Sequence, residues 1–236
     1  MSVLFPLEPL GSRTKVCDGT GGGYLPHNQR CSSSESMPDA VTLRKKLRAK
    51  RLALSPGEQR LHALSAARHF ARSSLLLRFS RIALYIANNG ELDPAPIAAR
   101  IRECGKSTYL PVLQSPPRQA LWFCEHRKGE TLHPNRFGIP EPDTMKHRLL
   151  PAWGLDLILM PLVAFDSNGN RLGMGGGFYD RTLAYLHRRT CWQHPSLIGL
   201  AHACQEVAEI KPNSWDIPLD GIITESGLFK FHNFGR

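Results

Sequence analysis

Residues 171–181 have the sequence Arg171-Leu172-Gly173-Met174-Gly175-Gly176-Gly177-Phe178-Tyr179-Asp180-Arg181, and the rest of the chain is organised around them. The run just before, residues 155–164, is almost wholly apolar, which predicts a buried strand. Ser167-Asn168-Gly169-Asn170 predicts a turn. After the glycines, Leu183 and Leu186 lie three residues apart, which favours a helix. The predicted order is therefore strand, glycine loop, helix.

This order suits phosphate binding. Glycines let backbone N–H groups approach a ligand closely, and the start of a helix adds partial positive charge. Arg171 offers a bidentate phosphate contact, and Asp180 offers a ligand for a metal that bridges phosphates. The two common phosphate motifs are absent, because no Gly-Lys-Ser/Thr triplet occurs and Phe178 stands where the dinucleotide pattern needs a glycine. On the local pattern alone, glycines that serve only packing in a tight connection remain an alternative.

Composition limits the class of protein. At 236 residues the chain is one domain, or one domain with an appendage. No run of 18 or more apolar residues occurs, so no membrane span is expected. The six cysteines are scattered without Cys-x-x-Cys, and no His-Glu-x-x-His occurs, so neither a structural zinc site nor a disulfide framework is expected. A reducing cytoplasm is the predicted location. His202 and Cys204 are close in sequence, but we interpret them as packed residues at a strand end rather than a thiol catalyst.

The net charge of +10 is concentrated in one region. Residues 41–81 hold eleven Lys or Arg and one acid, Glu58, so their balance, +11 − 1 = +10, equals that of the whole chain. A basic region of this kind attracts nucleic acid, nucleotides or acidic small molecules. A solvated helix face is the alternative.

Residues 1–36 differ from the rest in composition and lack apolar periodicity, which predicts a disordered extension. We hypothesise that translation begins at Met37 and that residues 37–236 are the folded domain. Within it, Ser55-Pro56-Gly57-Glu58 predicts a helix start with a capping box. Helices are expected at 40–54, 56–73 and 94–104, and strands at 81–86, 107–112, 120–124, 155–164, 196–201 and 221–224. Residues 133–142 are expected to form a long functional loop.

Alternating strands and helices predict a single α/β domain, with a mainly parallel sheet, helices on both faces and basic N-terminal helices. In such sheets, ligands bind at the carboxyl ends of the strands. The glycine loop follows the strand that ends at Ala164, and a turn follows Ile86. We therefore expect these two segments to contribute to one site.

Together these segments resemble the 5-formyltetrahydrofolate cyclo-ligases, also called methenyltetrahydrofolate synthetases. The similarity rests on residues 171–180 and on the basic first helix followed by Leu54-Ser55-Pro56. It extends to Gly90-Glu91-Leu92-Asp93, Tyr109-Leu110-Pro111-Val112 and Trp215-Asp216-Ile217-Pro218, in the family's order. It covers residues 40–228. It implies ATP-dependent closure of 5-formyltetrahydrofolate to 5,10-methenyltetrahydrofolate, with Mg²⁺ as cofactor.

The resemblance also implies roles for individual residues. Two are implied in catalysis, Arg171 and Asp180, and two in binding Mg²⁺, Asp180 and Asp216. Those implied in binding the nucleotide are Arg44, Arg171, Gly173, Met174, Gly175, Gly176, Gly177, Phe178 and Tyr179. Those implied in binding folate are Ile86, Glu91, Phe137, Met174 and Phe178. The family's first helix usually offers the ATP two basic residues four apart. Arg44 matches the second of them, and Ala40 stands at the first.

Two rival functions remain to be weighed. A basic RNA-binding module would use residues 41–81, but such modules interleave aromatic residues with basic ones, and this stretch has only Phe70 and Phe79. A small-molecule kinase would use the same glycine loop but release a stable phosphorylated product. The basic helices are better explained by attraction for ATP and for the glutamate or polyglutamate tail of folate. No nucleic-acid or membrane partner is expected.

Overall fold

The computed structural model describes residues 39–114, 119–188 and 195–231. They all belong to one compact unit, Pro38–Arg236. The predicted disordered extension, 1–36, and its hypothetical start-site origin lie outside the described residues. Among the described helices, none combines the length and the apolar character that crossing a membrane requires.

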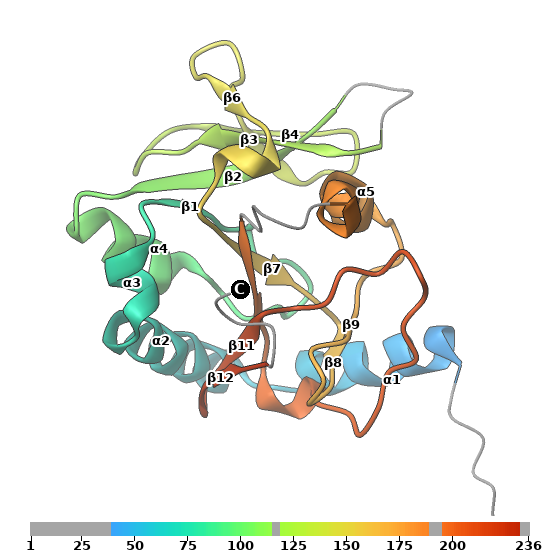
Figure 1. Ribbon diagram of the computed structural model, residues 1–236. Coiled ribbons are helices and arrows are strands. Elements are labelled where there is room, and N and C mark those ends of the chain that lie inside the picture. Colours follow the sequence, from blue (N-terminus) through green and yellow to red (C-terminus); the bar gives the residue numbers. More distant parts are fainter. Residues whose placement is uncertain (1–38, 115–118, 189–194, 232–236) are drawn as a thin grey trace, which may run out of the picture. The chain divides into compact units, whose positions relative to one another are not determined.

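An eight-stranded sheet forms the centre of this unit, in the order β12-β11-β10-β7-β1-β2-β3-β6 (Figure 1). The five strands from β11 to β2 are parallel, and the pairs at the two edges are antiparallel. A mainly parallel sheet is thus confirmed. The strands are β1 (Arg81–Ala83), β2 (Ser107–Leu113), β3 (Leu121–Glu125), β6 (Leu149–Leu150), β7 (Leu157–Pro161), β10 (Ser196–Leu200), β11 (Gly221–Thr224) and β12 (Gly227–Lys230).

Helices cover both faces of this sheet, as the sequence predicted. Successive residues of β7 alternate between two apolar clusters, because neighbouring side chains of a strand point to opposite faces. Leu157 and Leu159 pack in the cluster that contains residues of α2, α3 and α4, whereas Ile158 and Met160 pack in the one that contains Leu183 of α5. The α-helices are α1 (Ala40–Leu52), α2 (Pro56–Arg72), α3 (Ser74–Arg78), α4 (Ala95–Glu103) and α5 (Phe178–Leu183). Single-turn 3₁₀ helices are η1 (Ala152–Gly154), η2 (Ala184–Arg188) and η3 (Ala203–Gln205).

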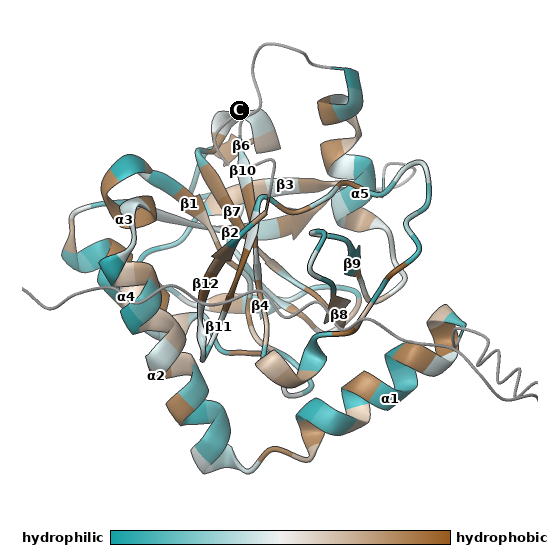
Figure 2. Ribbon diagram, turned by 60° about the horizontal axis from the view of Figure 1, so that its bottom comes forward, coloured by the Kyte–Doolittle hydropathy of each residue, from teal (hydrophilic) through white to brown (hydrophobic). Residues whose placement is uncertain are grey.

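The predicted start of the second helix is confirmed in detail. The Ser55 hydroxyl accepts the Glu58 N–H at 3.2 Å, and the Glu58 carboxylate accepts the Ser55 N–H at 2.8 Å. The first helix, α1, packs differently from the others. Its Leu47 lies in a small apolar cluster with Val163 and Ala164, beside the two-stranded ribbon of β8 (Ala164–Phe165) and β9 (Arg171–Leu172). Figure 2 shows polar residues along most of α1, with apolar residues between them.

Three expectations need correction. The predicted loop at 133–142 contains a two-stranded hairpin, β4 (Leu132–Pro134) with β5 (Pro140–Pro142). Its three prolines argued against strands, because proline is rare inside a sheet. The predicted strand at 155–164 is divided, because the chain leaves the main sheet after β7 and forms β8. The predicted strand at 81–86 is regular only to Ala83, although the Leu84 N–H still reaches the Tyr109 carbonyl at 2.9 Å.

The strand order reverses between β1 and β7. From β1 the chain continues to β2 on one side, and from β7 it continues to β10 and β11 on the other. The loops that leave the carboxyl ends of β1 and β7 therefore diverge and leave a crevice, which is where open α/β sheets bind ligands. The turn after Ile86 follows β1, and the glycine loop follows β7 by way of β8 and β9.

Asp220, just before β11, gives a test of the packing beside β10. Its carboxylate accepts the Leu197 N–H at 2.7 Å, and burial raises its pKa from 3.8 to about 6. Because the folded state favours the protonated form, this stability is complete below pH 3.8 and is lost as the pH rises through about 6. Asp220→Asn keeps an oxygen acceptor but cannot ionise. We expect it to raise the melting temperature at pH 7.5 and not at pH 4, with a gain in unfolding free energy at pH 7.5 of at most about 3 kcal/mol. Equal gains at both pH values would contradict this assignment.

Candidate active site

The glycine loop connects β9 to α5 with backbone that only glycine adopts easily. Gly175 has φ of +101° and Gly177 has φ of +60°, both in the left-handed region. A Cβ on Gly177 would lie 2.8 Å from a terminal nitrogen of Arg181. Among the described residues, the N–H groups of Gly175, Gly176 and Gly177 donate to no acceptor. The loop therefore presents a row of free donors, as phosphate binding requires.

Two arginines hold the loop through its carbonyl groups. Arg44, from α1, donates from Nε to the Gly173 carbonyl at 2.8 Å. Arg181, from α5, donates from Nη2 to the Gly176 carbonyl at 2.5 Å. The structure thus brings Arg44 to the loop, as the resemblance implied, across 129 residues of sequence. Arg181 was not predicted as a site residue, although its place directly after Asp180 was a signal.

Arg171, in β9 just before the loop, pairs with Asp180 of α5. Its Nη2 lies 2.5 Å from Oδ1 of Asp180, and its Nη1 donates to the Ile217 carbonyl. Burial lowers the pKa of Arg171, and the charges of Asp180 and Asp216 oppose that shift. Asp216 accepts the Asn213 backbone and side-chain N–H groups with one oxygen, Oδ2. The charges of both carboxylates implied in metal binding therefore oppose the lowering of the same guanidinium's pKa. Each carboxylate also has one oxygen that accepts from no protein donor among the described residues.

Glu91 lies at the carboxyl end of β1, largely buried. Its Oε2 accepts the Asn88 N–H at 3.1 Å, and its Oε1 lies 3.7 Å from Nη2 of Arg51. Burial raises the pKa of Glu91. Tyr179, from α5, is close enough that the Glu91 charge adds to burial in raising the pKa of its phenol. The turn after Ile86 therefore lies near enough to Tyr179, just after the glycine loop, for the charge of Glu91 to act on its phenol.

Arg51 contacts the turn that carries Glu91, and the sequence interpretation did not include it in the site. It is fully buried and donates to the Asn89 carbonyl at 2.9 Å and to the Leu162 carbonyl at 3.3 Å. Three buried side-chain atoms lack a hydrogen-bond partner among the described residues: Nη2 of Arg51, Nδ1 of His126 and the hydroxyl of Tyr179. Such atoms cost about 1–3 kcal/mol each when left unpaired. A ligand that bonded to them would recover that cost.

The residues implied in folate binding fall into two groups. Ile86 and Glu91 line a cavity of about 480 Å³ beside the carboxyl end of β1. Phe137, on the β4–β5 hairpin, lies edge-on to Phe178 with ring centroids 6.0 Å apart. Phe137 and Met174 are both about half exposed. The hairpin thus brings the aromatic side chain of Phe137 to the start of α5, directly after the glycine loop.

Comparisons with known proteins show the family of the chain. The model of the 5-formyltetrahydrofolate cyclo-ligase family matches residues 36–225. The chain belongs to this family. A 5-formyltetrahydrofolate cyclo-ligase of Escherichia coli K12 is 37% identical over 187 residues, 78% of this chain and all of that protein. One of Mus musculus is 30% identical over 204 residues, 79% of this chain and 97% of that protein.

A solved structure supports the same assignment. The 5,10-methenyltetrahydrofolate synthetase of Aquifex aeolicus superposes with a TM-score of 0.68 at 28% identity, over 84% of this chain and 94% of that one. The family of the chain and its fold are thus confirmed. As a member of the 5-formyltetrahydrofolate cyclo-ligase family, the protein is an enzyme of the ligase class in folate one-carbon metabolism.

Tyr179→Phe tests whether the unpaired hydroxyl belongs to the ligand. Removing a buried hydroxyl that has no partner should leave the melting temperature of the free enzyme unchanged or higher. The same change should weaken ligand binding by about tenfold, the value of one hydrogen bond of about 1.4 kcal/mol. Calorimetric unfolding and ligand titration of both proteins measure the two effects. A lower melting temperature with unchanged affinity would assign the hydroxyl a structural role instead.

Proposed function

We propose that this cyclo-ligase converts 5-formyltetrahydrofolate to 5,10-methenyltetrahydrofolate with consumption of ATP and release of ADP and phosphate. The observation that carries the proposal is the glycine loop of free N–H donors together with the cavity lined by Glu91, beside the two strands between which the sheet order reverses. A loop of free N–H donors suits the phosphates of a nucleotide. A buried carboxylate in an adjoining cavity suits the donor edge of a pterin.

The reaction needs an activated formyl group, because a formamide oxygen is a poor leaving group. In the first step the formyl oxygen attacks the γ-phosphorus, the bond to the bridging oxygen breaks, and ADP leaves. N10 then attacks the activated carbon, the C–O bond breaks, and phosphate departs with the formyl oxygen while N10 loses its proton. Such transfer depends on positioning and charge stabilisation more than on a protein nucleophile.

Two overlapping groups of residues bind the nucleotide and the folate. The N–H groups of Gly175, Gly176 and Gly177 receive phosphate oxygens, with Gly173, Met174, Phe178 and Tyr179 completing the nucleotide side of the site. Arg44 and Arg181 add positive charge at the loop. Arg171 orients Asp180 and adds positive charge on the nucleotide side of the site. Ile86, Glu91 and Phe137, with Met174 and Phe178, bind the folate.

Asp180 and Asp216 fit Mg²⁺, which prefers carboxylate oxygens and commonly takes only one or two protein carboxylates. Each has an oxygen free of protein donors among the described residues. When held by these two carboxylates, Mg²⁺ would neutralise negative charge on the phosphates. The basic helices α1 and α2 attract ATP and the glutamate tail of folate. We propose small-molecule substrates and a cytoplasmic location, with neither nucleic acid nor a membrane as partner.

The direct test follows near-ultraviolet absorbance as the protein is mixed with 5-formyltetrahydrofolate and MgATP. We expect an ATP-dependent band of the methenyl product, with free phosphate released in equal amount. Asp180→Asn, which keeps an oxygen for Arg171, should lower kcat by about 10²–10³-fold, as loss of one charge-stabilising group does. Glu103→Gln, an exposed acid on α4, serves as the control. A stable phosphorylated folate without the methenyl band would indicate a kinase, and full activity of Asp180→Asn would remove Asp180 from the metal site.

Glu91→Gln tests the folate side separately. Gln keeps one oxygen for the Asn88 N–H but loses the charge that a pterin donor would meet. We expect the folate KM to rise about tenfold, from loss of one charge-assisted hydrogen bond. The ATP KM should change less than twofold. Glu91→Asp should restore part of the effect. Equal rises in both KM values would place Glu91 outside the folate pocket.

A further inference from the structure

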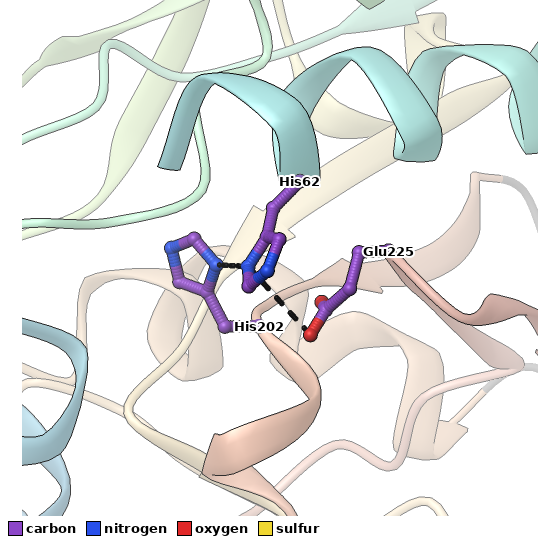
Figure 3. A group of neighbouring side chains, drawn as sticks. All are labelled: His62, His202 and Glu225. Atoms are coloured by element: carbon purple, nitrogen blue, oxygen red, sulfur yellow. Dashed lines mark hydrogen bonds and ion pairs between the residues drawn. The ribbon is translucent and has the colours of Figure 1, made fainter. Parts of the chain in front are cut away.

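Three side chains from distant parts of the sequence meet outside the candidate active site (Figure 3). His62 comes from α2, His202 follows β10, and Glu225 follows β11. The Nδ1 atoms of the two histidines lie 2.9 Å apart, and Oε1 of Glu225 lies 3.6 Å from Nδ1 of His62. His202 is fully buried, whereas the side chains of His62 and Glu225 are about one-fifth exposed. The cluster therefore has a buried end and an end that solvent reaches.

Hydrogen bonding fixes the protons of this cluster. Nε2 of His202 lies 3.2 Å from the Gly90 carbonyl, which can only accept, so Nε2 carries a proton. The two Nδ1 atoms are within hydrogen-bond distance, so one of them donates and the other accepts. With its proton on Nε2, the neutral ring of His202 has a lone pair on Nδ1, and His62 is then the donor across this contact.

We propose that His62, His202 and Glu225 bind a divalent transition-metal ion of the Zn²⁺ type in place of that shared proton. Nδ1 of His62, Nδ1 of His202 and Oε1 of Glu225 would be the ligands. At metal–ligand distances of about 2.0–2.1 Å, tetrahedral ligands lie about 3.3 Å apart. The observed separations of 2.9 and 3.6 Å lie on either side of this value. Binding releases the Nδ1 proton of His62 to solvent.

Atoms around the ligands already support them in the way that metal sites require. The Gly90 carbonyl selects the His202 tautomer that leaves Nδ1 free for the metal. The backbone N–H of Ala203 lies 3.2 and 3.0 Å from the two oxygens of Glu225, which orients that carboxylate. Two imidazoles favour zinc and its neighbours over Mg²⁺, so this site is distinct from the carboxylates assigned to Mg²⁺. A fourth position, on the exposed side, is left for water.

The ion would join three elements that the sequence separates by up to 163 residues, since 225 − 62 = 163. By fixing the His202 ring, it would also hold the Gly90 carbonyl, which lies 3.2 Å from Nε2 of that ring and is next to Glu91. Metal binding at this cluster would therefore stabilise α2 against the sheet and restrict the turn that carries Glu91. The stabilising effect is independent of the proposed function, and only the link to Glu91 rests on it.

Titration of the untagged full chain with Zn²⁺, followed by calorimetry and by thermal unfolding, tests the proposal without folate or ATP. We expect wild type to bind one ion that His62→Gln and Glu225→Gln bind at least about 100-fold more weakly. Free Zn²⁺ at about a hundred times the wild-type Kd should raise the wild-type melting temperature by about 5–10 °C and that of either variant by less than about 2 °C.

His69→Gln is the matched control. His69 lies on the same helix and contacts Glu225, but through the backbone carbonyl at 3.2 Å, so its loss should leave Zn²⁺ affinity intact. The Co²⁺ complex of wild type should show visible absorption of a tetrahedral site, and the His62→Gln protein should not. Equal Zn²⁺ affinity of wild type and both ligand variants would overturn the proposal. A lack of cyclisation activity would bear on the proposed function and leave this result untouched.

Discussion

The arrangement of the site depends on the buried guanidinium of Arg51. It donates to the carbonyls of Asn89 and Leu162 and pairs with the Glu91 carboxylate. Asn89 and Glu91 follow β1, and Leu162 follows β7, so one side chain joins the two strand ends between which the sheet order reverses. Removing one partner of a buried ion pair typically costs about 3–5 kcal/mol. The charge of Arg51 therefore fixes the turn after β1 relative to the segment after β7. Moving either one away would leave part of the buried guanidinium without a partner.

Arg171 repeats this arrangement on the nucleotide side. It is buried, and Asp180 compensates its charge as Glu91 compensates that of Arg51. The two carboxylates that we assign to ligands are thus held in place before any ligand arrives, which is how polar sites avoid reorganisation during a reaction. At both positions, stability and function rest on the same carboxylate. Replacement by the amide separates the two effects better than truncation to alanine, because an oxygen remains for the arginine.

Much of the fold was predictable because its signals are local. Ser55 and Glu58 are neighbours, so their capping box predicts the start of α2, and the apolar run before the glycine loop predicts β7. The glycine loop and Arg44 could be named through a resemblance. The burial of Arg51 could not, because its partners lie 38 and 111 residues away and a basic run usually predicts a solvated face. Likewise, no spacing rule brings together His62 and His202, 140 residues apart.

The turn before Glu91 shows why these distant contacts matter. Asn89 and Gly90 have φ of +50° and +73°, so two consecutive residues are left-handed, a conformation that Asn adopts only at a cost. A Cβ at Gly90 would lie 3.3 Å from the Arg51 carbonyl, which leaves little room for another residue. The Asn89 carbonyl accepts from Arg51, and the next carbonyl, that of Gly90, accepts from His202. Two buried side chains thus hold the carbonyl groups of a turn that the Asn-Gly sequence already favours. The position of Glu91 is consequently set by α1 and by the segment after β10 together with the turn's own hydrogen bonds between Asn88 and Glu91.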